Sequence, residues 1–298
     1  ADEFVSRFHG QSAVLPSIRA LGDVDDQELL LSNPNPADFA SLDPVVEPIK
    51  KQLILSRLVN AWSNSLNPEQ RELYEGADIV MPASVSDAIW FAADLSELMD
   101  TVATEEADWS ALAGLVPDDY ANWWKLTLEF LQIATARWPD ILAEFEQQDG
   151  AYLRSALLHK QADGYRNFGA PGPVIAAGST GSIPATAELL KSIAHMDQGV
   201  VILPALDRDL DDETWEKIDL PDSELKEFGT APGHPQFGLK LLLHRLGTSR
   251  SMQEIRHLDS VTHRDGGALR LREKLLSEAL RPAQSTGHWQ RLSTTVSD

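Results

Sequence analysis

Apolar residues recur at intervals of three and four positions along residues 45–168, the spacing typical of amphipathic α-helices. Turn-forming residues such as Asn67 and Pro68 interrupt the pattern and divide it into segments. Five helices are predicted in this way: Val45–Leu66, Ser86–Ala103, Asp118–Thr135, Trp138–Gln147 and Ala151–Phe168. No convincing strand pattern occurs among them, so we expect residues 45–168 to form an all-helical subdomain.

The spacing also predicts which side chains these helices bury. In the first helix Ile49, Leu53 and Trp62 fall near one face, while Lys51 falls elsewhere. The apolar residues expected on one face of the second helix are Ile89, Trp90, Ala93, Leu95, Leu98 and Val102. Ser84 is placed to cap that helix. Tryptophans at helical spacing indicate a core rather than a platform for stacking bases.

The pattern changes after Gly172. Two short apolar runs, Val174–Ala177 and Val200–Leu203, are bounded by Gly or Pro and are too short to be buried helices, which favours strands. Residues 184–194 between them have helical spacing, and Pro184 lies near the first turn, where its missing N–H carries no cost. Strand, helix and strand form a βαβ unit, so we predict adjacent parallel strands in a buried sheet covered by helices.

A glycine-rich loop leads from the first strand into this helix, and its residues are Gly178, Ser179, Thr180, Gly181 and Ser182. Thr180 or Ser182 can cap the helix, and the loop N–H groups could hold an anion at the helix N-terminus. The loop is neither a P-loop, because G-x-x-x-x-G-K-[ST] occurs nowhere in the chain, nor a nucleophile elbow. The interpretations left open are a structural turn, a residual phosphate or DNA-backbone contact, and catalysis, in decreasing order of preference.

Carboxylates are missing where a nucleotide-hydrolysing motor needs them. In superfamily 1 helicases the corresponding strand ends in an Asp-Glu pair that holds magnesium, whereas Ala177 is followed by glycine, serine and threonine. A metal-assisted phosphoryl-transfer centre therefore cannot form there. Acidic residues follow only the second strand, as Asp207–Asp212, and their spacing does not continue into a calcium loop. An N-cap and acidic turn before a short helix at Glu213–Lys217 is predicted instead.

The string AAGSTGSIPATAELL (residues 176–190), followed by LDRDLDD (residues 206–212), resembles the AddB family of the alphaproteobacterial type. AddB proteins are the nuclease-bearing partners of AddA in a helicase–nuclease that processes DNA double-strand breaks. The strings that agree elsewhere are LPSIRALGDVDDQELLL (15–31), GLVPDDYANWWKLTLEFLQI (114–133), PGHPQFGLKLLLHRLG (232–247) and REKLLSEALRPAQST (272–286). The resemblance covers nearly the whole chain and implies an internal fragment of the inactive helicase-like region.

This resemblance implies an α/β fold in which residues 1–44 and 169–298 form a degenerate, superfamily 1 helicase-like parallel-sheet domain. Residues 45–168 would be its inserted helical subdomain. The implied function is a catalytically silent segment that scaffolds an AddA-like helicase subunit and guides DNA in the intact complex. Asp207 and Asp209 would take the position of the helicase sensor motif. The iron–sulfur cluster and magnesium of the family belong to a nuclease domain outside these residues, so we expect no catalytic residue, cofactor or metal here.

The net charge of −21 opposes nucleic-acid binding, but the charge is unevenly placed. Residues 1–233 carry 15 Lys and Arg against 40 Asp and Glu, whereas residues 234–298 carry 10 against 6. This second part is predicted to contain two helices, Phe237–Leu246 and Asp265–Leu280. We expect any DNA contact to lie in it, and the candidate residues are His234, Gln236, Arg264 and Arg270.

The absence of cysteine excludes disulfides and fits a reducing cytoplasm, so we expect a cytoplasmic protein. No apolar run reaches the roughly 18–20 residues that span a bilayer, and no membrane partner is expected. Two other functions stay open. One is a free-standing α/β nucleotide-binding protein or enzyme that uses the glycine-rich loop, although no phosphate-binding lysine follows the glycines. The other is a protein-interaction module built on the helical subdomain.

Overall fold

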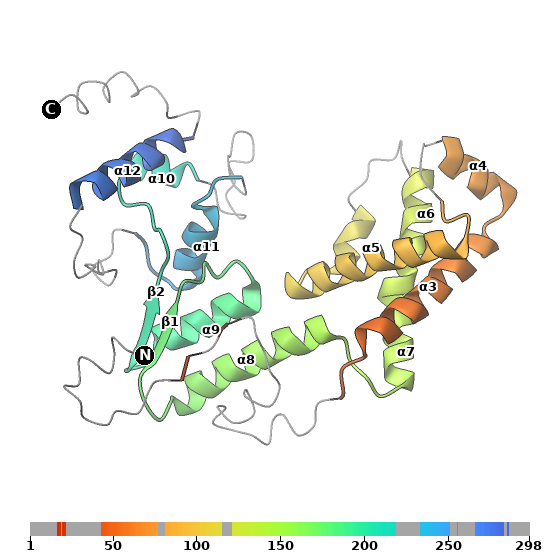
Figure 1. Ribbon diagram of the computed structural model, residues 1–298, viewed down its shortest axis with the longest axis horizontal. Coiled ribbons are helices and arrows are strands. Elements are labelled where there is room, and N and C mark those ends of the chain that lie inside the picture. Colours follow the sequence, from red (N-terminus) through yellow and green to blue (C-terminus); the bar gives the residue numbers. More distant parts are fainter. Residues whose placement is uncertain are drawn as a thin grey trace.

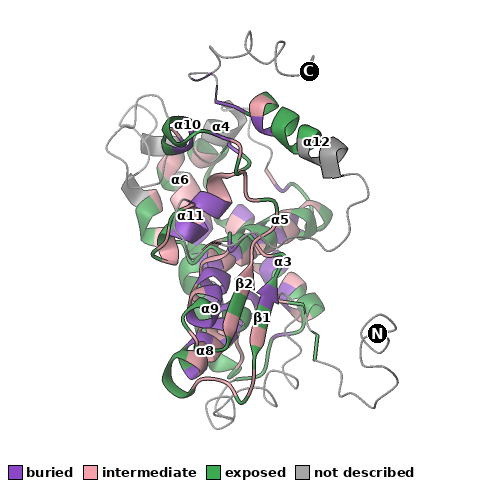
Figure 2. Cartoon of the chain, turned by 90° about the vertical axis from the view of Figure 1, so that its left-hand side faces the viewer, coloured by how far each residue is buried: buried purple, intermediate pink, exposed green. Residues whose placement is uncertain are grey.

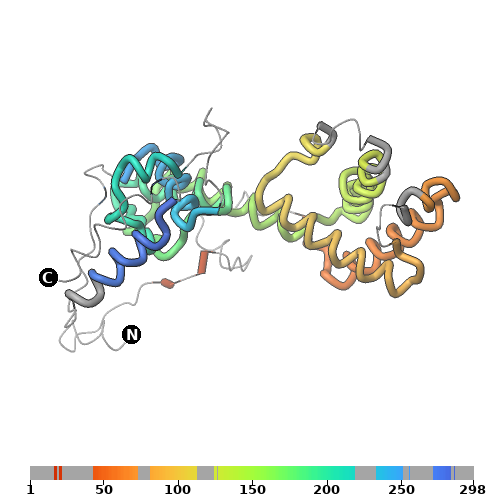
Figure 3. Tube along the Cα trace, turned by 90° about the horizontal axis from the view of Figure 1, so that it is seen from above, coloured from red at the N-terminus to blue at the C-terminus, as the bar shows by residue number. Residues whose placement is uncertain are grey.

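The computed structural model describes residues 17–18, 20–21, 43–76, 81–114, 121–218, 233–250, 255, 266–282 and 285. Figure 1 shows two lobes, a helical lobe containing α3 to α7 and a sheet lobe containing β1, β2 and α9 to α12. Helix α8 (Gly150–Phe168) extends from one lobe to the other, and the view in Figure 3 shows the same separation. Most of residues 1–44, which we predict to belong with the sheet, lie outside the described residues.

Helices account for the lobe that the spacing predicts to be all-helical. Its elements are α3 (Pro48–Ser65), α4 (Pro68–Gly76), α5 (Val85–Thr104), the 3-10 helix η2 (Trp109–Gly114), α6 (Ala121–Gln132), the π-helical turn η4 (Ile133–Arg137) and α7 (Trp138–Glu144). Among the described residues of 43–168, β structure is limited to one isolated bridge between Val45 and Gln148. The predicted helical character of this part is therefore confirmed.

Two helical details differ from the prediction. Asn67 and Pro68 end α3 as expected, but they also begin α4, because Asn67 Oδ1 accepts from Gln70 N at 2.8 Å and Gln70 Oε1 accepts from Asn67 N at 3.0 Å. This reciprocal pair is a capping box. The predicted break before Trp138 is absent, since η4 joins α6 to α7 through a π-turn. At the start of α5, Ser84 caps the helix as predicted, in a capping box with Asp87.

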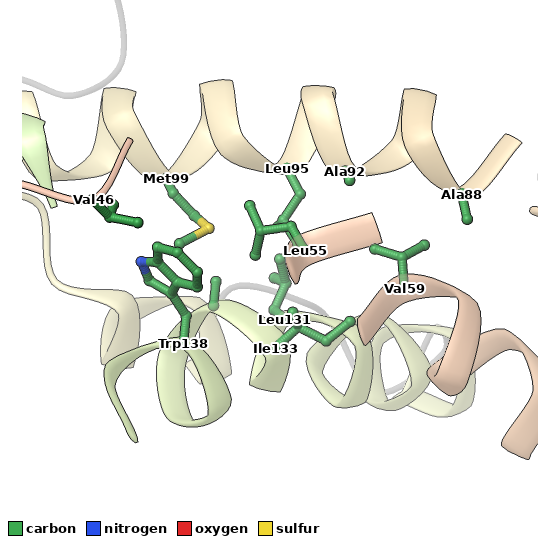
Figure 4. Packing of buried hydrophobic residues seen from close by; sticks show 11 residues of the cluster. Val46, Leu55, Val59, Ala88, Ala92, Leu95, Met99, Leu131, Ile133 and Trp138 are labelled. Atoms are coloured by element: carbon green, nitrogen blue, oxygen red, sulfur yellow. The ribbon is translucent and has the colours of Figure 1, made fainter. Parts of the chain in front are cut away.

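The core of the helical lobe lies between α3, α5 and the continuous stretch from α6 through η4 to α7, as Figure 4 shows. Small residues of α5, Ala88 and Ala92, let α3 approach closely, and Trp138 fills the far end of the cluster with 2% of its surface exposed. The predicted buried faces of α3 and α5 are wrong at several large residues: Ile49 is 65% exposed, Leu53 54%, Ile89 42%, Trp90 71% and Leu98 43%. Side-chain size is a poor guide here, because close helix packing selects small residues at the contact.

The sheet lobe contains the predicted βαβ unit. Strands β1 (Val174–Ala177) and β2 (Gly199–Ile202) pair in parallel, with Val174 opposite Gly199 and Ala177 opposite Ile202. The bounds of β1 and of α9 (Pro184–Ala194) match the prediction, and β2 lies one residue earlier. The remaining elements are α10 (Asp212–Glu216), α11 (Phe237–Arg245) and α12 (Gly266–Ala279). The predicted α/β character is confirmed at this level, as a mainly helical fold with a small parallel sheet.

The sheet is less buried than the predicted buried sheet covered by helices. Helix α9 packs against one side, where Ala176 is buried with Leu189 and Leu190. On the strands Ile175 is 66% exposed and Val200 50% exposed, and Figure 2 shows both strands in exposed and intermediate colours. The sheet has two strands among the described residues, so its outer side has no layer over it there.

Helix α8 belongs to the core of the sheet lobe and contacts the helical lobe at α5. It packs along α9, where Leu158 and Ala162 join the cluster around Ala176, and it also contacts α5. Its N-terminus is capped by Asp149, whose Oδ1 accepts from Ala151 N at 3.3 Å. A long helix with partners at both ends explains how the two lobes are joined without a flexible connection between them.

Candidate functional site

The glycine-rich loop lies at the carboxyl ends of the two parallel strands, where α/β proteins commonly bind ligands. Gly178 N donates to Ile202 O at 3.1 Å, so the loop starts as an extension of the strand pairing. Gly178 and Gly181 have φ values of 82° and 58°, in the left-handed region that favours glycine. A Cβ on Gly181 would lie 2.7 Å from Leu242 Cδ1 of α11. Glycine at 181 is therefore favoured both by its left-handed φ and by the close approach of Leu242 on α11.

The polar residues of the loop do not cap α9 as predicted. The N-cap residue is Ile183, which makes no side-chain cap, while Ser179 Oγ accepts from Gly181 N at 3.2 Å within the loop. An uncapped helix N-terminus attracts anions. However, the segment from Gly178 to Thr186 contains no Lys or Arg that could clamp a phosphate. The loop geometry is that of a structural strand-to-helix turn.

The sensor-like tract forms an internal turn beyond β2. Asp207 Oδ1 accepts from Asp209 N at 2.9 Å and from Leu210 N at 3.0 Å. The backbone of Asp207 is held as well, because its N–H donates to Gln236 Oε1 at 3.0 Å and its carbonyl accepts from Arg250 at 3.1 Å. One carboxylate oxygen of Asp207, Oδ1, is thus used as an acceptor within its own turn.

The side chains of His234 and Gln236, two candidates for DNA contact, are hydrogen-bonded to other parts of the protein. Gln236 Nε2 donates to Ala205 O at 3.0 Å, so the amide bridges the strand-end turn. His234 Nε2 donates to Leu280 O at 3.0 Å, and its Nδ1 accepts from Gln236 N at 3.1 Å. These bonds require the neutral imidazole, and burial lowers the pKa of His234 in agreement. Both residues hold the fold together in this conformation, and contact with DNA stays a prediction.

The other two DNA candidates cannot be placed in a site. Arg264 lies outside the described residues, and for Arg270 the structure describes only the helical backbone. Arg250, another cation of this part, lies with its guanidinium 4.7 Å from the centre of the Trp215 ring and donates to Asp212 at 2.7 Å. It is committed to internal contacts, so the C-terminal part offers fewer free cations than its composition indicates.

No local pattern in the sequence signals a charge cluster that joins α10 and α12 in the sheet lobe. The N-cap of α10 is Asp211, as the acidic turn predicted, and its Oδ1 accepts from Thr214 N at 2.8 Å. Arg281, beyond the end of α12, donates to Asp211, to Thr214 Oγ1 at 2.8 Å and to both oxygens of Glu278. The hydrogen bond from Arg281 holds the pKa of Asp211 well below its usual range. This cluster ties α12 to α10 through residues far apart in sequence.

A cleft of about 650 Å³ lies where the C-terminal ends of α8 and α9 meet. Its polar lining includes Arg166, Lys191 and His195. Arg166 donates to Asp163 at 2.8 Å and to Glu188 at 3.3 Å. Helix C-termini carry partial negative charge and attract cations to their last turn, which accounts for these residues without an anionic ligand.

The described residues do not provide a set of side chains that could bind a metal cofactor. They contain no group of three or more His, Asp or Glu placed to hold a metal ion. The chain has no cysteine, so the iron–sulfur cluster that the resemblance implies has no thiolate ligand within these residues. None of the helices in the described ranges combines the length and apolarity that crossing a bilayer requires.

Comparisons with known proteins add no identification. No family model matches the chain, no curated protein matches it, and no solved structure matches it.

Proposed function

We propose that this chain is a catalytically silent, helicase-like segment of a DNA double-strand-break repair helicase–nuclease. Its role would be to scaffold an AddA-like motor subunit and to guide one DNA strand. The observation that carries the proposal is the βαβ unit whose first strand runs into a loop, Gly178–Ser182, with no phosphate-binding lysine and no metal-binding carboxylate. A parallel βαβ unit with a glycine-rich turn is compatible with the frame of a nucleotide-hydrolysing motor that lacks its reacting groups.

The geometry of the strand ends supports a structural role over catalysis. The Gly178–Ser182 loop packs on α11 through Gly181, and the Asp207 turn is closed by its own backbone N–H groups. Both loops are therefore used to join β1, β2 and α11. The resemblance to the AddB family supplies the biological setting of the proposal, including the motor partner and the DNA substrate.

A phosphate-release assay tests the silent part of the proposal. The purified chain should hydrolyse ATP no faster than background, with or without single-stranded DNA. Turnover above background that Ser182→Ala, a change at an exposed residue of the loop, abolishes would instead support the alternative of a nucleotide-hydrolysing enzyme that uses this loop.

Fluorescence anisotropy with labelled oligonucleotides tests the DNA part. We expect weak binding that falls steeply with salt, because the contact must use the few cations after residue 233. Replacing Arg264 and Arg270 by Ala should lower the salt slope by roughly one unit for each phosphate that the variant no longer neutralises. Tight binding that salt does not weaken would contradict the electrostatic argument.

A protein-interaction module remains the second candidate, and one observation favours it. Trp90 is 71% exposed on α5, and Asp94 and Glu97 on the same helix are exposed too. An acidic surround repels nucleic acid, so this tryptophan suits a protein partner better than a stacked base.

A further inference from the structure

The turn that begins α11 holds a second turn at the end of β2. We call His234 and Gln236, in the first of these turns, the latch, and residues 205–210 the strand-end turn. Gln236 Nε2 donates to Ala205 O and Gln236 Oε1 accepts from Asp207 N, both at 3.0 Å. One amide side chain therefore connects the two turns through both of its ends.

Ala205, the first residue of the strand-end turn, has a conformation that alanine rarely adopts. Its φ of 47° lies in the left-handed region, which favours glycine. The later part of the turn is closed locally, because Asp207 Oδ1 accepts from Asp209 N and Leu210 N. The earlier part, from Ala205 to Asp207, is joined to the latch by the two bonds of Gln236. A strained residue that is held in this way can relax when Gln236 moves away.

The buried imidazole of His234 positions Gln236. Its Nδ1 accepts from Gln236 N at 3.1 Å, and its Nε2 donates to Leu280 O at 3.0 Å. A proton on Nδ1 would replace this acceptor by a second donor, which would face the N–H of Gln236 and repel it. The bond from Nε2 to Leu280 can persist in either state of the ring. Protonation therefore acts on Gln236 and the strand-end turn rather than on the attachment of α12.

The charges around the imidazole of His234 do not hold it in the protonated form. Among the described residues, Asp207 favours the proton, but burial of the ring opposes it more strongly and lowers the pKa of His234. Other charged residues on the elements that the latch joins are paired with one another: Glu278 with Arg281, Lys240 with Glu216, and Arg250 with Asp212. The closed turn is therefore fully stable above the ordinary histidine pKa of about 6.5 and weakens as pH falls below it.

We propose that His234 and Gln236 form a pH-sensitive latch, which holds the strand-end turn closed while the ring is neutral and releases it when the ring is protonated. On release, Gln236 leaves Ala205 O and Asp207 N, and Ala205 can return to a negative φ. The segment that follows β2 then changes conformation next to the glycine-rich loop that follows β1, because both segments leave the same edge of the parallel sheet. The switch is independent of the function proposed above.

Amide hydrogen exchange of the full chain, followed by NMR between about pH 7.5 and pH 5, measures the release. The reporters are the amides of Gln236 and Asp207, which donate to His234 Nδ1 and to Gln236 Oε1. After correction for the intrinsic pH dependence of exchange, their protection should fall about tenfold for each pH unit below about 6.5, until pH reaches the lowered pKa of the closed turn. The amide of Gly178, which donates to Ile202 O in the sheet, should keep its protection.

His234→Asn separates the latch from a general effect of acid. Asparagine Oδ1 can accept from Gln236 N but does not titrate, so the protection of Asp207 should be constant with pH, whatever its level. His195→Asn is the matched control, because His195 is an exposed histidine at the end of α9, and this variant should keep the wild-type pH dependence.

Titration of the wild-type histidine rings by NMR provides a second measurement. The signal that is missing from His234→Asn identifies the ring, and its pKa should lie below the ordinary value of about 6.5. Three results would overturn the proposal: wild-type protection of Asp207 that does not depend on pH, a His234→Asn variant that keeps the wild-type dependence, or a His234 ring that titrates at or above the ordinary pKa.

Discussion

Replacing Lys51 by Met tests whether one buried ion cluster fixes the helical lobe. Lys51 Nζ lies 2.7 Å from Asp100 Oδ1 and 2.8 Å from Asp149 Oδ2, and its side chain is 8% exposed. Trp138 Nε1 donates to the same Asp149 oxygen at 3.1 Å. One lysine thereby connects α3, α5 and the start of α8, with the core tryptophan of α7 alongside.

The expected cost follows from what the substitution leaves behind. Removing one member of a buried ion pair typically costs about 3–5 kcal/mol, because the other charge stays buried without a partner. Asp149 is 5% exposed at its side chain, but it keeps the Trp138 and Ala151 N–H groups as donors. We therefore expect Lys51→Met to lower the free energy of unfolding by about 2–4 kcal/mol.

Asp100 provides a control within the same cluster. Its side chain is 48% exposed, so its pair with Lys51 is largely solvated and Asp100→Asn should cost about 0.5 kcal/mol. Asp149→Asn keeps an acceptable N-cap and removes the charge. Combined with Lys51→Met it should cost at least about 1 kcal/mol less than the two single changes added together.

Urea unfolding followed by far-ultraviolet circular dichroism at neutral pH measures all four variants. Hydrogen exchange of the α3 and α5 amides would show that the loss is located in the helical lobe. The reasoning fails if Lys51→Met costs less than Asp100→Asn, or if the single costs of the Lys51 and Asp149 changes simply add.

Two further predictions concern the sheet lobe. The depressed pKa of Asp211 means that its stabilising effect is complete above about pH 4, its unfolded range, and is lost as pH falls below that. Asp211→Asn, which keeps the cap, should therefore destabilise the protein at pH 7. Its cost should begin to shrink as pH falls below about 4 and should disappear only when pH falls through the lowered folded pKa, as urea titrations at several pH values would show; a cost that does not change with pH would contradict this. Gly199→Ala should lower the free energy of unfolding by about 2 kcal/mol or more, because the new Cβ would lie 1.7 Å from Ile193 O. Gly172→Ala, with nothing within 4 Å, is its control and should be nearly neutral in thermal melts; equal effects of the two would refute the packing argument.

Backbone elements of this chain follow closely from local sequence. The bounds of α9 and β1 match the prediction because Gly172, Gly178 and Pro184 set them through local conformational rules. The close approach at Gly181 shows where local rules stop, because it is made by Leu242, on a helix about sixty residues later. Helical periodicity identifies the helices but assigns some exposed residues to their buried faces. Trp90 and Leu53 are as hydrophobic as core residues, but they lie on exposed sides of their helices.

The candidate site is harder to anticipate than the fold. His234 and Gln236 stand in a turn that resembles a contact loop, yet their partners are Leu280 and Ala205, which no local pattern connects to them. Helical spacing places Lys51 away from the apolar face of its helix, yet it is 6% exposed, because its carboxylate partner Asp149 begins a helix far along the chain. The role of a polar side chain depends on its partners in the folded structure. Those partners are distant in sequence, so spacing alone does not identify them.

The cations that the fold buries change what the surface can bind. The chain has 25 Lys and Arg against 46 Asp and Glu, and four of these cations, Lys51, Lys240, Arg250 and Arg281, have side chains at most 9% exposed. Several of their carboxylate partners stay exposed, among them Asp212 at 85% and Glu216 at 76%. Pairing a buried cation with an exposed acid holds the fold together, but the acid's free oxygen still faces solvent while the cation offers nothing to a ligand. The surface that DNA would meet is therefore more acidic than the composition indicates, and any guidance of DNA by this chain requires a basic partner to provide most of the phosphate contacts.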